Sequence, residues 1–175
     1  MLEIVALVVV LLVAAVLIFA ATKPDAFRIE RAASIKAPPE KIFAFINDLH
    51  QWVSWSPWEN IDPALKRAHS GAASGKGAVY TWEGNSKVGA GRMEVMESVP
   101  PSKITIKLDF IKPFEGHNTA EFRLVPKDGS TSVTWAMFGP SNYISKVMSL
   151  FFSMDRMVGG QFERGLANLK ALSEK

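Results

Sequence analysis

The chain offers few residues that could carry out catalysis or bind a metal. Its three histidines, His50, His69 and His117, lie on separate segments without the His-x-x-x-His spacing of a helical metal site. Cysteine is absent, which excludes disulfides, thiolate metal sites and a cysteine nucleophile. There is also no phosphate loop, no Gly-x-Ser-x-Gly turn and no dinucleotide fingerprint. We therefore predict no metal, no cofactor and no catalytic residues of these kinds.

General acid–base catalysis would need a titratable side chain that faces the interior. Alternation along the predicted strands turns Asp109, His117 and Glu121 outward. The side chains predicted to point inward are apolar or neutral: Tyr80, Trp82, Met93, Val95, Leu108, Phe110, Asn118, Ala120, Phe122, Trp135 and Met137. Such an interior suits an apolar small molecule held by shape, and it suits proton transfer poorly.

Arg31 is the one charged residue on the apolar face of the first predicted strand. In one interpretation the guanidinium lies at an edge, where it reaches solvent or pairs with an acid. In the other it contacts an anionic group of a ligand.

Short alternating segments predict a curved antiparallel sheet. The strands are expected at residues 27–35, 65–69, 78–83, 91–99, 103–110, 118–124 and 133–137. After the first strand, Pro38-Pro39-Glu40 opens a short helix, and the tryptophans Trp52, Trp55 and Trp58 follow in a short helix and loop. These rings either cap the core or line the mouth of a cavity.

The C-terminal segment predicts one long amphipathic helix from Asn142 to the C-terminus. Its apolar stripe recurs every three or four residues: Ile144, Val147, Leu150, Phe151, Met154, Val158, Phe162, Leu166 and Leu169. Packing this helix across the sheet gives an α+β sandwich. Gly159 and Gly160 within it, with Met148, Met154 and Met157 nearby, indicate either a cavity at the joint or a helix that merely kinks and packs.

Together these elements define a candidate binding site between the sheet and the helix. Its predicted ligand-binding residues are Trp55, Trp58, Tyr80, Trp82, Met93, Leu108, Phe110, Asn118, Ala120, Phe122, Trp135, Met137, Met154 and Val158.

The N-terminus carries an apolar run from Ile4 to Ala21, long enough to cross a bilayer. A cleaved signal peptide would have a basic start and a shorter apolar core, whereas Glu3 is the only charge here. We expect a retained anchor at 1–21, a linker at 22–26 and one globular domain at 27–175. Lys23, Arg28 and Arg31 follow the span, so the positive-inside rule predicts a cytoplasmic domain.

The formal net charge of +3 is spread along the chain without a basic run. Nucleic acid is therefore not an expected partner.

Several motifs resemble the START-like (SRPBCC, helix-grip) superfamily, in particular its bacterial polyketide cyclase/dehydrase-type members. These motifs are residues 35–43 (IKAPPEKIF), 55–58 (WSPW), 89–94 (GAGRME) and 99–104 (VPPSKI). The resemblance, which extends over about residues 27–172, implies the helix-grip fold: a curved antiparallel sheet of about six to seven strands wrapped around a long C-terminal helix, with a cavity for hydrophobic ligands between them. It implies no reaction, because the family has no common set of catalytic residues.

From the sequence we expect a membrane-anchored, non-enzymatic domain that binds a lipid or another hydrophobic small molecule. The alternatives are an enzyme of the polyketide cyclase/dehydrase kind and a scaffold or accessory subunit of a membrane protein complex.

Overall fold

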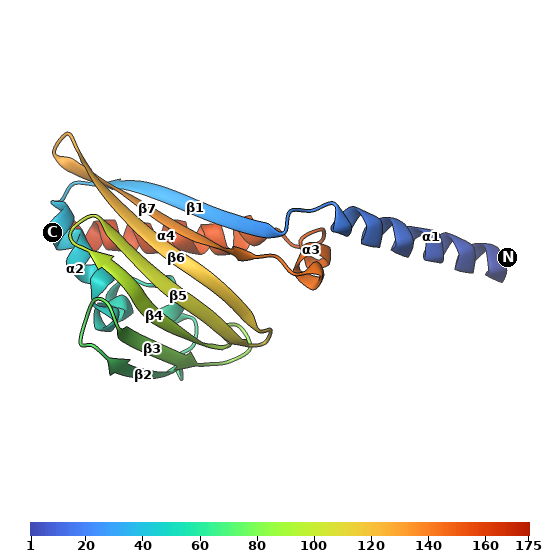
Figure 1. Ribbon diagram of the computed structural model, residues 1–175, viewed down its shortest axis with the longest axis horizontal. Helices are drawn as coiled ribbons and strands as arrows, with labels where there is room; N and C mark the ends of the chain where they lie inside the picture. The colour runs from blue at the N-terminus through green and yellow to red at the C-terminus, as the bar shows by residue number, and fades with distance from the viewer.

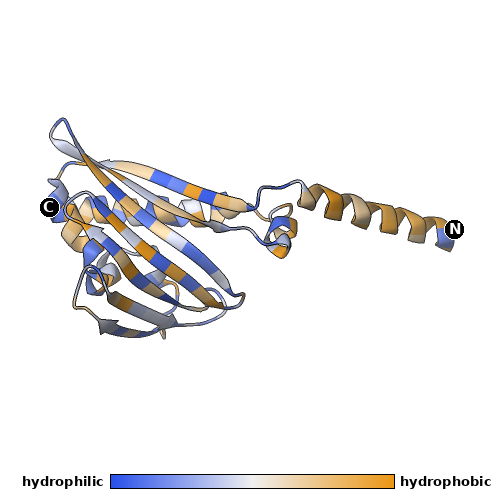
Figure 2. Ribbon diagram, in the orientation of Figure 1, coloured by the Kyte–Doolittle hydropathy of each residue, from blue (hydrophilic) through white to orange (hydrophobic).

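Seven antiparallel strands form one curved sheet in the order β1-β7-β6-β5-β4-β3-β2 (Figure 1). The computed structural model describes all residues from Met1 to Lys175. The strands are β1 (Ala26–Ile35), β2 (Lys66–Gly71), β3 (Ala78–Glu83), β4 (Ala90–Val99), β5 (Lys103–Lys112), β6 (Gly116–Lys127) and β7 (Ser130–Pro140). All seven predicted strands are confirmed, and Figure 2 shows the hydrophobic and hydrophilic bands that alternate along them.

Three short helices connect β1 to β2. They are α2 (Pro39–Asn47), η1 (Leu49–Ser54) and η2 (Pro57–Asn60). Proline occupies the first turn of α2 and of η2, where its missing N–H costs nothing. Ile42, Phe43 and Ile46 form the buried face of α2, as the sequence predicts. Trp52 and Trp55 donate their indole N–H groups to the carbonyls of Ile46 and Phe45. These bonds hold η1 against the end of α2.

The prediction of one continuous C-terminal helix is wrong. The segment forms α3 (Tyr143–Met148), then a turn at residues 149–153, then α4 (Met154–Ser173). The reason is local capping: the Asn142 side chain accepts from the N–H of Ser145, and the Ser153 side chain accepts from the N–H of Arg156. Each cap starts its own helix.

Of these two helices, only α4 packs against the sheet as a core helix. Phe162, Leu166 and Leu169 are buried, whereas Ile144 and Phe151, from the first half of the predicted stripe, are 70% and 66% exposed. The second half of the apolar stripe therefore packs in the core, whereas the first half remains largely exposed on the surface.

Two glycines of α4 provide a matched test of this packing. A Cβ on Gly165 would lie 2.7 Å from Cζ3 of Trp135, whereas a Cβ on Gly160 would have nothing within 4 Å. We expect Gly160→Ala to raise the free energy of unfolding by about 1 kcal/mol, because alanine favours the helix. Gly165→Ala is expected to lower it by about 1 to 3 kcal/mol through overpacking. Chemical denaturation of the full chain measures both; equal effects would contradict this packing of α4.

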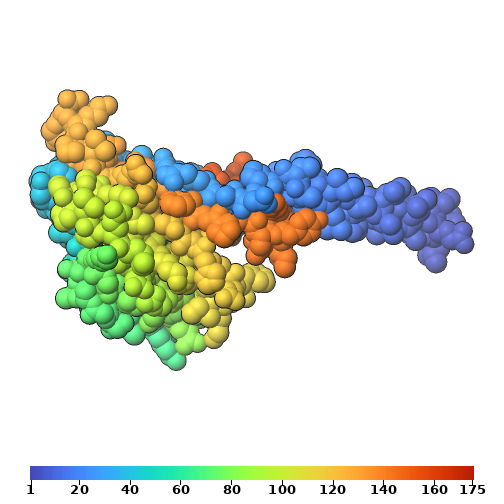
Figure 3. Space-filling view, viewed as in Figure 1, coloured from blue at the N-terminus to red at the C-terminus, as the bar shows by residue number.

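The first helix, α1 (Leu2–Ala21), projects away from the domain (Figure 3). It is long and apolar enough to cross a membrane, and nearly all of its side chains are exposed. Its last turn touches the domain: Ala20 is fully buried, and the Tyr143 hydroxyl donates to the carbonyl of Leu17 at 2.7 Å.

Candidate ligand-binding site

The inner face of the sheet has a buried middle and a partly exposed end. Cross-strand pairing joins Trp82 to Gly91, Gly91 to Phe110, and Leu108 to both Met93 and Asn118. These residues therefore form neighbouring rows at one end of the sheet. Trp82, Leu108, Phe110 and Asn118 are half-buried, and we call these four residues the open end.

The open end is at the end of the sheet where β1 begins and β7 finishes. Figure 1 shows α1 and α3 at that end, next to β1 and β7. Trp82 covers the neighbouring strand there, because a Cβ on Gly91 would come within 2.3 Å of the indole. Trp82 and Phe110 meet edge to face at 6.0 Å. The open end thus presents aromatic and aliphatic surface with one amide, and none of its four side chains titrates.

The middle of the inner face is closed by aromatic packing. Trp135 stacks on Phe162 of α4 at 4.2 Å and on Phe122 of β6 at 4.9 Å. Trp55 packs edge-on against Trp135 at 5.5 Å, and Trp58 does so at 5.6 Å. These rings bridge sheet, helix and the η1–η2 segment.

The structure brings together most of the predicted site residues, in two groups. Tyr80, Met93, Ala120 and Met137 are buried beside the open end, and Trp55, Trp58, Phe122 and Trp135 belong to the aromatic centre. Val158 is half-buried against the core. Met154 is apart from both groups, because it is 46% exposed at the first position of α4. Whether any of these residues contacts a ligand stays a prediction.

Arg31 pairs with acids, in agreement with the first interpretation of this residue. Its guanidinium donates to the carboxylate of Asp155 at 2.8 and 3.0 Å and to that of Glu163 at 2.7 Å. These hydrogen bonds, first to Asp155 and then to Glu163, raise the pKa of Arg31 and keep it charged. These ion pairs hold the first half of α4 against β1.

A buried acid that the sequence analysis missed lies under the β2–β3 edge. The Glu59 carboxylate, on η2, is 7% exposed. It accepts hydrogen bonds from Arg67 Nε at 2.5 Å and from the Tyr80 hydroxyl at 2.7 Å. Burial, and then the bond to Glu59, raise the pKa of Tyr80, so its phenol stays protonated. Alternation could not find Glu59, because a 3₁₀ turn has no two-residue period.

One buried donor lacks a partner at the centre of the site. Trp135 is only 2% exposed, so its indole nitrogen is buried, yet this N–H makes no hydrogen bond. A buried, unpaired N–H costs about 1 to 3 kcal/mol. An acceptor atom brought in by a ligand would remove this cost.

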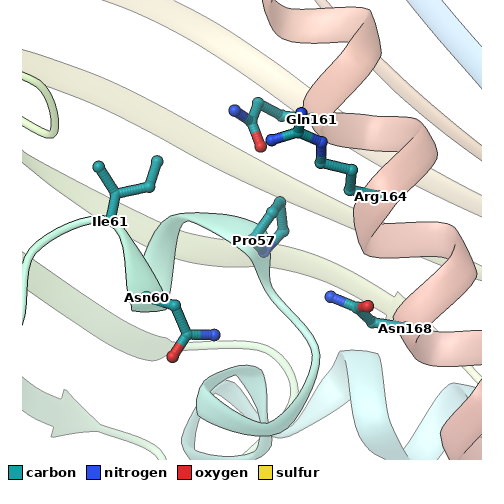
Figure 4. Close-up of a pocket in the computed structure, with 6 residues that line it drawn as sticks. All are labelled: Pro57, Asn60, Ile61, Gln161, Arg164 and Asn168. Atoms are coloured by element: carbon teal, nitrogen blue, oxygen red, sulfur yellow. The ribbon is translucent and has the colours of Figure 1, made fainter.

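A separate surface pocket of about 350 Å³ lies between η2 and α4 (Figure 4). Its lining is mostly polar: Pro57, Asn60, Ile61, Gln161, Arg164 and Asn168. None of the predicted ligand-binding residues lines it. No group of three or more histidine or acidic side chains comes together as a metal site.

An antiparallel seven-stranded sheet that grips a C-terminal helix places the protein in the START-like superfamily. Within it, the chain belongs to the family described as polyketide cyclase/dehydrase and lipid transport, whose model matches residues 26–174. No curated protein matches the chain significantly.

Solved structures with the same fold come from varied proteins. Protein CV1439 from Chromobacterium violaceum has a TM-score of 0.59 and 17% identity, over 87% of this chain and 99% of that one. The major latex-like protein 151 of Panax ginseng has a TM-score of 0.62 and 12% identity, over 87% and 100%. The di-domain aromatase/cyclase BexL from the BE-7585A biosynthetic pathway has a TM-score of 0.63 and 11% identity, over 90% of this chain and 53% of that chain. At these identities the likeness shows the fold alone.

Proposed function

We propose that this protein is a membrane-anchored binding domain for an apolar small molecule or lipid, which it holds at the open end between the sheet and α4. Residues 1–21 are the anchor, 22–26 the linker and 27–175 the binding domain. The observation that carries the proposal is the open end itself: Trp82, Leu108, Phe110 and Asn118 face inward yet remain half-buried. Apolar surface left uncovered on the inside of a sheet favours occupation by an apolar ligand.

The ligand class follows from the polar groups available. Asn118 lies within the open end, and the unpaired Trp135 N–H lies in the neighbouring aromatic centre. Both can donate to oxygen. An apolar chain or ring system that carries an acceptor oxygen, such as a fatty acid or a polyketide-like ketone, matches the Asn118 amide at the open end.

The same geometry disfavours the enzyme alternative. Glu59 is the buried acid in contact with an inner-face residue, but Arg67 and Tyr80 occupy its two carboxylate oxygens. The Tyr80 hydroxyl donates a hydrogen bond to Glu59, and its raised pKa keeps the proton on the phenol. Neither group is free to exchange a proton with a substrate.

Native mass spectrometry of the full chain, extracted in a mild detergent, tests the proposal. We expect one retained apolar molecule per chain, which is released on denaturation and identified in the organic extract. The molecule should survive detergent exchange that strips lipid from α1, because it would bind against the inner face of the sheet and not on the surface of that helix. A chain that carries no such molecule, and that takes up no added fatty acid, would contradict the proposal and favour the scaffold alternative.

A further inference from the structure

Exposed apolar side chains beyond residues 1–21 concentrate in one short segment. Seven of the thirteen large exposed ones lie between residues 143 and 157: Tyr143, Ile144, Met148, Phe151, Phe152, Met154 and Met157. We call these seven residues the 143–157 patch. Scattered apolar side chains are ordinary on a surface, but a contiguous group of this kind marks an interaction site.

The patch is held firmly beside the end of α1. The Tyr143 hydroxyl bonds to the carbonyl of Leu17, in the last turns of that helix. The buried Lys146 donates to the Asp25 carboxylate at 2.5 Å, and the N–H of Ser141 donates to the Asp25 carbonyl at 2.7 Å. The bond from Lys146 lowers the pKa of Asp25, so this carboxylate stays ionised at neutral pH. Figure 1 shows α3 next to the base of α1.

This position fixes the depth of the patch relative to a bilayer. A helix of 20 residues is about 30 Å long, the thickness of the hydrocarbon core. If α1 crosses the membrane, its last turn reaches the interface, and α3 packs on that turn. Tyrosine, phenylalanine and methionine at this level would meet lipid and not water.

The charges around the patch agree with a lipid surface. Of the acids nearby, Asp25 pairs with Lys146, while Asp155 and Glu163 share the single cation Arg31, so this second cluster keeps one negative charge. The cations Lys23 and Arg156 form no ion pair with a carboxylate. The four cations around the patch thus exceed its three acids by one charge, and this small positive excess suits phosphate head groups.

We infer that the 143–157 patch inserts into the interface of the bilayer that α1 crosses, and so turns the open end toward that membrane. This inference rests on the proposed function. The β5–β6 turn, with Phe114 74% exposed, lies at the same end of the sheet. An apolar ligand would then pass between bilayer and binding site without crossing bulk water.

Because the chain has no cysteine, single-cysteine variants allow a direct test. Phe151→Cys probes the patch, Leu11→Cys probes the middle of α1, and Val125→Cys is the control at the far end of β6. All three side chains are exposed, so the substitutions should not affect folding. The full chain carries a nitrobenzoxadiazole label and is reconstituted in phosphatidylcholine vesicles with phosphatidylglycerol. Quenching is measured with nitroxide lipids and with aqueous iodide.

We expect nitroxide lipids to quench the labels at positions 151 and 11 severalfold more strongly than the label at position 125. Aqueous iodide should quench only the label at position 125. A label at 151 that iodide reaches, while 11 is quenched by lipid, would overturn the inference but leave the anchor intact. A label at 151 shielded from both quenchers would mean that a second copy or another protein covers the patch, and would overturn it too. Lack of lipid quenching at 11 would refute the anchor itself. Ligand retention by native mass spectrometry is a separate readout, so failure of binding is distinguishable from failure of insertion.

Discussion

Replacing Leu108 by tryptophan is expected to reduce ligand retention at least tenfold while lowering the free energy of unfolding by less than about 1 kcal/mol. Overpacking a closed core typically costs about 1 to 3 kcal/mol. Leu108, however, is half-buried between Met93 and Asn118 at the open end. The larger ring can extend into the space that the ligand would use, so it competes with the ligand and does not strain the core.

Val125→Trp is the matched control for this substitution. Val125 is 58% exposed on the outer face of β6, away from the open end. The same ring added there should change neither ligand retention nor stability. Retention measured by native mass spectrometry, with chemical denaturation of both variants, checks the pair. A large loss of stability in Leu108→Trp with unchanged retention would show that the ligand binds elsewhere.

The sequence predicted the sheet well because alternation reports directly which side of a strand is buried. Residues 103–110 alternate, and the structure buries Ile104 and Ile106 on the predicted face. The same rule identified the inner-face residues of the candidate site. It could not say how deeply each one is buried, because that depends on where α4 crosses the sheet.

The C-terminal helix shows the opposite case. Its three- and four-residue spacing continues through Leu150 and Phe151, where the chain is in fact a turn. Apolar residues recur at helical spacing wherever one face of a helix meets an apolar environment. A protein core and a lipid surface therefore produce the same sequence pattern. The cap at Ser153, which starts a second helix, carried the missing information. A polar residue of this type before each helix marks its start independently of the stripe.

Glu59 was missed for a different reason. Its partners, Arg67 and Tyr80, come from β2 and β3, so the pairing is visible only once the strands are placed. Its position in a 3₁₀ turn gives no face assignment. Buried polar clusters of this kind are set by tertiary contacts, and sequence pattern alone does not locate them.

The Glu59 cluster supports the largest expected effect on stability. We expect Arg67→Met to lower the free energy of unfolding at neutral pH by about 3 to 5 kcal/mol, because it leaves a buried carboxylate without its cation. Glu59 would retain only the hydrogen bond from Tyr80. The reverse substitution, Glu59→Gln, removes the charge of the acid and should cost less stability. The side chain of Arg67 is 31% exposed, so its guanidinium can be solvated by water instead.

The double variant Arg67→Met with Glu59→Gln separates charge from packing. It removes the unpaired charge, keeps a group that can accept from Tyr80, and should recover most of the stability lost in Arg67→Met. Denaturant titration of the wild type, the two single variants and the double variant completes the cycle. If the double variant were as unstable as Arg67→Met, the arginine would act through packing of its aliphatic stem over the β2–β3 edge, and Glu59 would carry no buried charge that needs compensation.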